Sequence, residues 1–355
     1  MSTSTLSREL ADLQSIPRNA PRAGKPAIEL HPLDFAARSA NELRPSTFEG
    51  LVGQTRLKAL LGRVVAVSRA SGRPLDHMLL VGSAGTGKTT FAQVIAHELG
   101  RDVYQLKAPV AQDVFEALAR TAQDGDVVII DEIHLVVSGD RRGITQAADP
   151  EMFYSLMEDK RLMTSTGVIN FPDVTFIGCT TDAGLLPSPF LARFPLQPVL
   201  DPYTEDELLA LANANAASLG LKLDYRGGMT LAKACRGNPR QLNTYMRNAR
   251  SLAATVVDRA LATEIVVDLN STTLDGLTRD MANMLRFLLR SPRVVRGETI
   301  YQAGLGSIAT ACGKSRDQKV VALFIEPYLI ERGFVAITHG GRALTPTGIE
   351  RARRL

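Results

Sequence analysis

The chain has 355 residues, 45% of them hydrophobic and 22% charged, a composition typical of soluble globular proteins. Its length exceeds one ordinary domain and predicts two or three domains, each with a core of its own. No apolar run approaches the roughly 18 residues of a membrane span, and the first residues lack the apolar centre of a secretory signal. We therefore expect a cytoplasmic protein without membrane contact. The 3 cysteines lie far apart, which argues against a disulfide framework or a zinc site.

The net charge of +4 is unevenly distributed along the chain. Residues 271–355 carry 13 Lys and Arg against 7 Asp and Glu, a net +6, whereas residues 1–270 carry 28 and 30, a net −2. A basic C-terminal quarter attached to a near-neutral remainder is typical of a nucleic-acid-contacting module. A solvated basic face without a partner is the alternative that charge alone leaves open.

Residues 1–40 form the first expected segment, an N-terminal extension with little pattern. Four prolines between positions 17 and 32 interrupt any long helix there. We expect at most one short amphipathic helix, at 5–14.

From residue 41 to 202, strand-like runs alternate with helical ones. The expected strands are 77–81, 102–106, 126–130 and 173–178, and the expected helices are 88–99, 112–121 and 150–158. Such alternation predicts an α/β domain with a parallel sheet covered on both faces.

A glycine-rich loop follows the first of these strands and fits the pattern G-x-x-x-x-G-K-[ST]. Loops of this kind bind phosphates through backbone N–H groups at a helix N-terminus. Lys88 would contact the β- and γ-phosphates, and the Thr89 hydroxyl would bind Mg²⁺. A glycine turn without a ligand is the alternative for an isolated match. The predicted nucleotide-binding loop comprises Gly82, Ser83, Ala84, Gly85, Thr86, Gly87, Lys88, Thr89 and Thr90.

The segment DVVIIDEIH, residues 126–134, strengthens the assignment. Its apolar run reads as a strand that places two carboxylates at the sheet's C-terminal edge. Asp131 can complete the Mg²⁺ shell, and Glu132 can polarise an attacking water. Together the two segments predict hydrolysis of a nucleoside triphosphate, by default ATP, with Mg²⁺. We interpret His134 as structural or as a relay, in preference to a catalytic acid.

Two further domains follow. Residues 203–274 read as a purely helical lid that opens at Thr204 and breaks at the Gly-Asn-Pro of 237–239. Residues 275–355 begin with helices and end in a hairpin across Gly340-Gly341, a pattern typical of a winged-helix domain.

Read together, these segments resemble the RuvB family of AAA+ motors, which drive branch migration of Holliday junctions as hexameric rings. The resemblance runs from about residue 41 to the C-terminus. Besides the two segments above, it rests on ELRPSTFEGLVGQ (42–54), LMED (156–159), FIGCTTDAGLLPSPFLARF (176–194), RGNPRQLN (236–243) and FIEPYLIERGFVAITHGGRALTPTG (324–348). It implies an AAA+ P-loop NTPase core, a small helical lid and a C-terminal winged-helix domain. It further implies a homo-oligomeric ATPase ring that moves or branch-migrates DNA.

The resemblance also implies roles for single residues in the nucleotide site. Arg44 and Pro45 would border the adenine pocket. Thr180 or Thr181, at the end of the 173–178 strand, would hydrogen-bond the attacking water or the γ-phosphate, although a Thr at a strand end can simply satisfy its own backbone. Arg240 would contact the γ-phosphate and couple nucleotide state to the lid.

In the C-terminal domain, we expect the best DNA phosphate contacts from Arg316, Lys319 and Arg342, with Arg342 at the hairpin tip. Contacts to phosphates position double-stranded or branched DNA without reading its sequence.

One departure from the family concerns catalysis in the ring. The family carries an arginine finger directly after the Thr-Thr pair, where this chain has Asp182. A carboxylate would repel the charge that spreads over the transition state, and loss of a finger costs about 10³–10⁵ in rate. We expect Arg193 to act in its place on the neighbouring subunit, with Arg141 or Arg142 as weaker candidates. The alternatives are that Arg193 is structural and the ring hydrolyses ATP poorly, or that a related ATPase supplies the arginine in a mixed ring.

A second departure concerns the partner. The family's protruding β-hairpin docks on the tetrameric RuvA junction clamp, but here segment 135–156 is enlarged and the stretch from 157–159 to the next strand looks short. We expect 138–149 to be an exposed loop, and we expect the altered 135–156 region and the N-terminal extension to bind an unidentified protein. Dependence on a RuvA-type clamp is therefore doubtful. An ATP-gated scaffold or loader with weak hydrolysis remains the alternative function.

Overall fold

The computed structural model describes residues 30–34, 43–137, 149–252, 255–295, 297–314 and 318–355. The expected helix at 5–14 and nearly all of the expected loop at 138–149 fall outside these ranges. Within them, no helix is long and apolar enough to cross a membrane.

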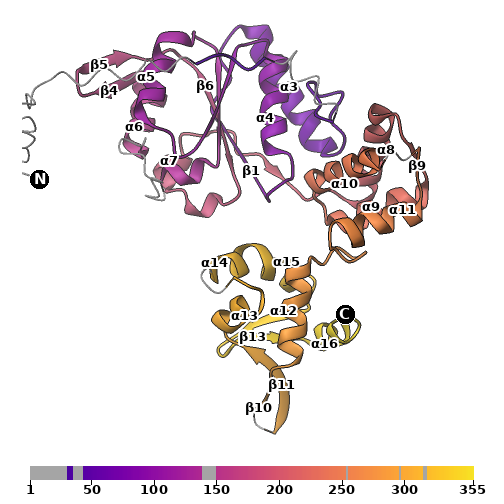
Figure 1. Cartoon of the computed structure of the whole chain (residues 1–355). Coiled ribbons are helices and arrows are strands. Elements are labelled where there is room, and N and C mark those ends of the chain that lie inside the picture. Colours follow the sequence, from indigo (N-terminus) through magenta and orange to yellow (C-terminus); the bar gives the residue numbers. More distant parts are fainter. Residues whose placement is uncertain (1–29, 35–42, 138–148, 253–254, 296, 315–317) are drawn as a thin grey trace, which may run out of the picture. The chain divides into compact units, whose positions relative to one another are not determined.

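A five-stranded sheet with the strand order β2-β3-β6-β1-β7 forms the centre of the N-terminal half (Figure 1). Its strands are β1 (Met78–Gly82), β2 (Val103–Lys107), β3 (Val127–Asp131), β6 (Thr175–Thr180) and β7 (Val199–Leu200). The pairs β2–β3, β3–β6 and β1–β7 are parallel. Every residue of β6 is buried, as expected for apolar strands of a parallel sheet.

The helices between the first strands agree closely with expectation. Helix α4 spans Lys88–Leu99 and α5 Gln112–Thr121, whereas α3, at Thr55–Ser71 ahead of β1, was not expected. The bounds of α4 and α5 coincide with the expected helices, whereas the strands begin one or two residues later than expected. For β3 the reason is visible at Asp126, whose carboxylate accepts a hydrogen bond from the Gln123 backbone N–H at 2.8 Å. Asp126 therefore belongs to the turn before the strand.

The expected helix at 150–158 is split in the structure. Helix α6 covers only Pro150–Tyr154, and a wider π-type turn, η2, continues from Ser155 to Asp159. Lys160, in the left-handed conformation at φ 54°, ends the turn. A 3-10 turn η1 (Ile133–Val136), a second one η3 (Ala183–Leu185) and the short helix α7 (Ser188–Leu191) complete this region.

An antiparallel hairpin that the sequence did not predict follows η2. It consists of β4 (Arg161–Thr164) and β5 (Gly167–Asn170). Met163 pairs with Val168 across it, and the two side chains are 62% and 54% exposed. The stretch that looked short for the family therefore contains a complete hairpin.

The lid is a group of four helices around its own core (Figure 1). Helices α8 (Glu205–Leu219), α9 (Tyr225–Cys235), α10 (Pro239–Ser251) and α11 (Arg259–Glu264) form it, and a π-type turn η4 (Ile265–Leu269) closes it. Thr204 and Glu207 form a reciprocal capping box at its start. The expectation of a purely helical lid is wrong in one respect: β8 (Lys222–Leu223) and β9 (Val256–Val257) pair in parallel.

The C-terminal domain combines helices with a four-stranded sheet of order β10-β11-β13-β12. Its helical elements are α12 (Arg279–Leu289), α13 (Leu305–Ala311), α14 (Gln318–Val320), η5 (Val321–Ile325), α15 (Glu326–Glu331) and α16 (Pro346–Arg353). Its strands are β10 (Pro292–Val295), β11 (Glu298–Ala303), β12 (Val335–Thr338) and β13 (Gly341–Leu344). The β12–β13 hairpin confirms the expected wing. The β10–β11 hairpin, which extends beyond the helices of this domain in Figure 1, was not predicted.

Candidate nucleotide site

The glycine-rich loop between β1 and α4 has a backbone that other residues could not adopt. Gly82, Gly85 and Gly87 have φ values of 159°, 85° and 100°. A Cβ atom on Gly82 would lie 2.7 Å from the Leu200 carbonyl oxygen, closer than real contacts allow. The Thr86 hydroxyl donates to the Ser83 carbonyl at 2.8 Å and closes the turn. The loop is therefore preshaped before any phosphate binds.

Lys88 is the first residue of α4, and its side chain turns back into the loop. The ammonium donates to the carbonyl oxygens of Gly82 at 2.7 Å and Ser83 at 2.9 Å. The residue is only 8% exposed. A cation held inside a loop of backbone N–H groups, at the positive end of a helix dipole, is the arrangement that binds phosphate.

The lid touches this loop through Asn238. Its Oδ1 accepts from the Gln241 N–H at 3.2 Å and caps α10, while its Nδ2 donates to the Ala84 carbonyl at 3.1 Å. A Cβ on Gly85 would lie 2.3 Å from Asn238 Oδ1. Sequence reasoning missed this contact, although the Gly-Asn-Pro break marked the position. Arg240 is exposed in the first turn of the same helix.

Other expected nucleotide-site residues are less defined. Arg44 is exposed, and Pro45 packs beside Gly50, where an added Cβ would lie 3.2 Å from Pro45 Cβ. Their role at an adenine pocket stays a prediction.

The expected acidic residues lie at the C-terminal end of β3. Asp131 is the last residue of the strand, and its Oδ2 accepts from the Gln105 side chain on β2 at 2.8 Å. Glu132 adopts the left-handed conformation, with φ 54° and ψ 43°. A non-glycine residue in this region carries backbone strain of roughly 1–3 kcal/mol, which is typical of functional positions.

His134 lies between Glu132 and the end of β6. Its Nδ1 is 3.1 Å from Thr180 Oγ1 and 3.5 Å from Glu132 Oε2. Thr180 is fully buried, whereas Thr181 is exposed. Of the two threonines left open by the sequence, Thr180 is the one that His134 connects to Glu132.

Mg²⁺ fits the donors that the sequence singled out. Among the residues described, no three acidic, His or Cys side chains cluster as a dedicated metal site. Mg²⁺ in nucleotide sites instead takes one or two protein oxygens, with phosphates and waters completing the shell. A Thr89 hydroxyl and an Asp131 carboxylate oriented by Gln105 are donors of that kind.

Arg193, the expected finger, is occupied within its own chain. Its Nη2 is 3.0 Å from Glu158 Oε1, and its Nη1 donates to the Pro189 carbonyl at 2.5 Å. The guanidinium carbon lies 3.8 Å from the centre of the Tyr154 ring. Asp182, where the sequence resemblance led us to expect the finger, accepts from the Gly184 N–H at 3.0 Å and caps η3. A role of Arg193 on a neighbouring subunit therefore requires these contacts to open.

The expected DNA contacts differ in how the structure places them. Arg342 was expected at the hairpin tip, and this placement is wrong: the turn is formed by His339 and Gly340, and Arg342 is the second residue of β13. Its guanidinium pairs with the buried Glu326 through hydrogen bonds of 2.6 and 2.8 Å, which raise the pKa of Arg342. Lys319 is exposed on α14, and Arg316 lies outside the described residues, as do Arg141 and Arg142.

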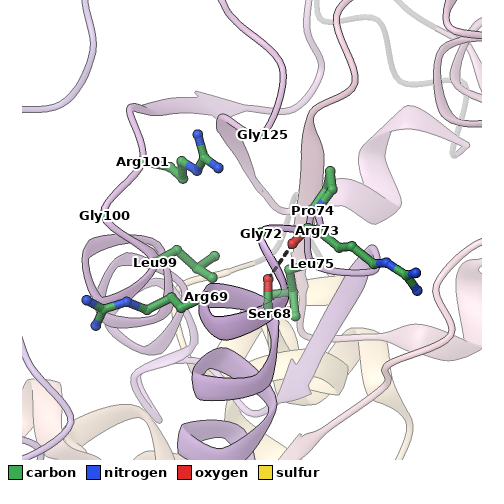
Figure 2. A pocket seen from close by; sticks show the side chains of 10 residues that line it. All are labelled: Ser68, Arg69, Gly72, Arg73, Pro74, Leu75, Leu99, Gly100, Arg101 and Gly125. Atoms are coloured by element: carbon green, nitrogen blue, oxygen red, sulfur yellow. Dashed lines mark hydrogen bonds between the residues drawn. The ribbon is translucent and has the colours of Figure 1, made fainter.

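A separate basic cavity of about 210 Å³ is lined by residues such as Leu75, Arg101 and Gly125, which lie just before strands (Figure 2). The expected nucleotide-site residues lie instead at or after the C-terminal ends of strands. Arg69 and Arg73 line it with their guanidinium groups pointing in opposite directions, and the Ser68 hydroxyl donates to the Arg73 carbonyl at 2.8 Å. The arginines do not converge on one point, so the cavity receives no ligand assignment.

Comparison with known proteins matches both ends of the chain to one family. Residues 43–200 match the model of the Holliday junction DNA helicase RuvB P-loop domain, and residues 276–352 match the RuvB C-terminal winged helix domain.

Whole-chain comparisons agree. The Holliday junction branch migration complex subunit RuvB of Prochlorococcus marinus is 34% identical over 346 residues, covering 92% of this chain and 93% of the relative. The subunit of the same name from Streptomyces avermitilis is 32% identical and covers 86% and 84%. The solved structure of the Thermotoga maritima RuvB Holliday junction branch migration motor superposes with a TM-score of 0.72 at 28% identity, over 88% of this chain and 98% of that one. The likeness extends across the nucleotide loop, the lid and the winged-helix domain, and the chain belongs to the RuvB family.

Proposed function

We propose that this chain is a RuvB-type ATPase that forms an oligomeric ring in the cytoplasm and couples ATP hydrolysis to branch migration of Holliday-junction DNA. Its relatives are named as subunits of the branch migration complex, and they cover nearly its full length. The observation that carries the proposal is the preshaped loop around Lys88, combined with carboxylates at the end of β3.

Each side chain has a role in hydrolysis. Lys88 and the loop N–H groups hold the β- and γ-phosphates, and Arg240 approaches the γ-phosphate from the lid. Thr89 and Asp131 hold Mg²⁺, which neutralises phosphate charge when bound. Glu132 polarises the attacking water, and Thr180 hydrogen-bonds that water or the γ-phosphate.

The ring supplies the remaining positive charge. We propose that Arg193 leaves its contacts with Glu158 and Tyr154 and reaches the nucleotide of the neighbouring subunit. A mixed ring with a related ATPase is the second possibility, because Asp182 cannot perform the finger's role.

DNA binds to the winged-helix domain in this proposal. Arg316 and Lys319 contact phosphates. Arg342 donates two of its five N–H groups to Glu326, so its other three N–H groups can donate hydrogen bonds to a phosphate. Its ion pair would then orient the guanidinium that DNA contacts.

A partner protein binds the β4–β5 hairpin, the segment in which the family resemblance places its docking hairpin. Met163 and Val168 form an exposed apolar pair there. The hairpin removes one of the reasons to doubt a RuvA-type clamp, since the stretch is long enough to build it. The identity of the partner is a matter for a binding experiment with purified RuvA.

The second candidate function is an ATP-gated scaffold or loader with weak hydrolysis. Asp182 at the finger position and the engagement of Arg193 within its own chain favour it.

A steady-state ATPase assay with and without four-way-junction DNA distinguishes the two functions. The motor requires stimulation by the junction that is lost in Lys88→Ala and Glu132→Gln, together with branch migration of a labelled junction. A negligible rate with tight ATP-dependent assembly would favour the scaffold.

A further inference from the structure

We propose that His134 is a positioning residue for ATP hydrolysis: one imidazole N–H holds the Glu132 carboxylate and the Thr180 hydroxyl in a fixed mutual arrangement. The inference rests on the proposed role of Glu132 in polarising water. It adds a residue that makes no contact with the nucleotide itself.

The geometry places a single ring nitrogen between two side chains, Glu132 directly after β3 and Thr180 at the end of β6. His134 Nδ1 lies 3.1 Å from Thr180 Oγ1 and 3.5 Å from Glu132 Oε2. The His134 side chain is 14% exposed and that of Glu132 is 38% exposed. The imidazole is thus largely shielded from water, which strengthens its electrostatic contacts.

The local backbone brings these groups together. Glu132 turns the chain through the left-handed region directly after β3, and Ile133 packs onto β6 beside Gly178. A Cβ on Gly178 would lie 2.9 Å from Ile133 Cδ1, so the turn rests directly on the glycine backbone. This close packing sets the reach of His134 towards Thr180.

Hydrogen-bond accounting then selects the tautomer. A carboxylate 3.5 Å away disfavours a bare lone pair on Nδ1, so Nδ1 carries the proton, donates it to Thr180 Oγ1 and attracts the Glu132 carboxylate electrostatically. Thr180 Oγ1 also accepts from the Asp182 N–H at 3.1 Å. Both lone pairs of the hydroxyl are therefore used, and its own proton is left to be donated.

This arrangement gives Thr180 and Glu132 complementary roles. Thr180 acts as a hydrogen-bond donor, suited to a phosphate or water oxygen, while Glu132 has one oxygen 3.5 Å from the imidazole Nδ1 and presents the other as an acceptor. Losing His134 would free the Glu132 side chain and allow the Thr180 hydroxyl to rotate. Such loss of preorganisation slows chemistry more than it weakens binding.

The test is single-turnover hydrolysis of labelled ATP by the full chain with Mg²⁺ and without DNA. A typical hydrogen bond contributes about 0.5–1.5 kcal/mol, so losing the one from His134 to Thr180 should slow hydrolysis in His134→Ala roughly 2–13-fold. Nucleotide affinity, measured by fluorescence titration, should change less than about 2-fold, because ground-state binding does not use the imidazole. His97→Ala, at an exposed position on α4, is the matched control.

Two conservative variants test the role without relying on the alanine variant. The amide of Asn reaches the place of Nδ1, whereas that of Gln reaches towards Nε2. His134→Asn should therefore retain more hydrolysis than His134→Gln. In addition, His134→Ala should have little further effect in a Thr180→Ala background, since the two residues act as one unit.

A wild-type rate in His134→Ala, equal rates in the Asn and Gln variants, or independent effects of His134 and Thr180 would each overturn the inference. Glu132→Gln in the same assay separates this failure from that of the proposed catalytic site. If Glu132→Gln retains full hydrolysis, the catalytic role of Glu132 is wrong. DNA stimulation, measured separately, tests the motor function.

Discussion

Replacement of Glu158 by Gln should accelerate ATP hydrolysis if Arg193 acts on the neighbouring subunit. In the structure Arg193 contacts Glu158, the Pro189 carbonyl and the Tyr154 ring. Each contact stabilises the position within the same chain and must be given up before the guanidinium can cross to another nucleotide. Weakening one of them shifts the population towards the released arginine.

The magnitude follows from the exposure of each partner. Glu158 is 58% exposed, so its ion pair with Arg193 contributes only about 0–1 kcal/mol. The stacking on Tyr154 contributes about 1 kcal/mol, and the charged hydrogen bond to Pro189 about 1.5–3 kcal/mol. Loss of the ion pair alone changes the released population by up to about 5-fold, since 1.36 kcal/mol corresponds to a factor of ten.

The assay is steady-state hydrolysis at a protein concentration that supports ring assembly. Glu158→Gln should raise the rate by up to about 5-fold, and Arg193→Ala should lower it by about 10³ with unchanged ATP affinity. A structural Arg193 gives the opposite pattern: Arg193→Ala lowers the melting temperature, and Glu158→Gln leaves the rate unchanged. That second pattern would refute the trans-acting role.

Three further predictions concern other parts of the chain. Burial, the largest cause, lowers the pKa of His77 from its ordinary value of 6.5 to about 4. Between pH 4 and 6.5 the unfolded chain binds a proton at His77 that the folded chain does not, so the free energy of unfolding should fall by about 3 kcal/mol as the pH drops from 6.5 to 4. In denaturant titrations His77→Asn should flatten this pH dependence. An unaltered slope in the variant would contradict the assignment to His77. Met163→Glu with Val168→Glu should abolish partner binding in a pull-down and leave basal hydrolysis within about 2-fold, whereas retained binding would move the partner elsewhere. Asn238→Ala should weaken ATP binding roughly 5-fold and lower the melting temperature, because a cap and a hydrogen bond to the loop of about 1 kcal/mol each are lost; unchanged affinity in titration calorimetry would show that the lid contact is dispensable.

The parts of the fold with a strong local signal could be predicted from the sequence. Helices α4 and α5 begin and end where periodicity and the loop motif placed them. The parallel sheet followed from apolar runs alternating with helices. In each case the residues that decide the structure are neighbours in the chain.

The two hairpins without such a signal were missed. Strands β4 and β5 have four residues each and carry Arg, Met, Asn and Thr in place of a clear apolar alternation. Strands β10 and β11 lie on either side of Gly297, whose φ of 86° supplies the turn. Short strands of this kind are stabilised by pairing, which a single window of sequence does not reveal.

The site itself was predicted as a set of residues but not as a network. The acidic segment, the loop and Thr180 were all expected, yet the bridge from His134 to Thr180 joins residues 46 positions apart. Its existence depends on Ile133 of η1 resting on Gly178 of β6, a contact between residues far apart in the chain. The sequence identifies the side chains that can take part in the chemistry. The folded sheet determines which of them lie within hydrogen-bonding distance of one another.

For the basic residues too, the sequence identified the side chains but not the contacts that they make. Arg193 and Arg342 were singled out because positive charge suits phosphates, but both have carboxylates of their own chain within 3.0 Å. Their partners differ in one decisive respect: Glu326 is 6% exposed, and Glu158 is 58% exposed. Breaking the Arg342 pair would strand a buried carboxylate at a cost of about 3–5 kcal/mol, whereas releasing Arg193 leaves Glu158 in water at about 0–1 kcal/mol. Glu158 therefore opposes the release of Arg193 only weakly, so the Tyr154 and Pro189 contacts set most of its cost, whereas we expect Arg342 to contact DNA only while it stays paired.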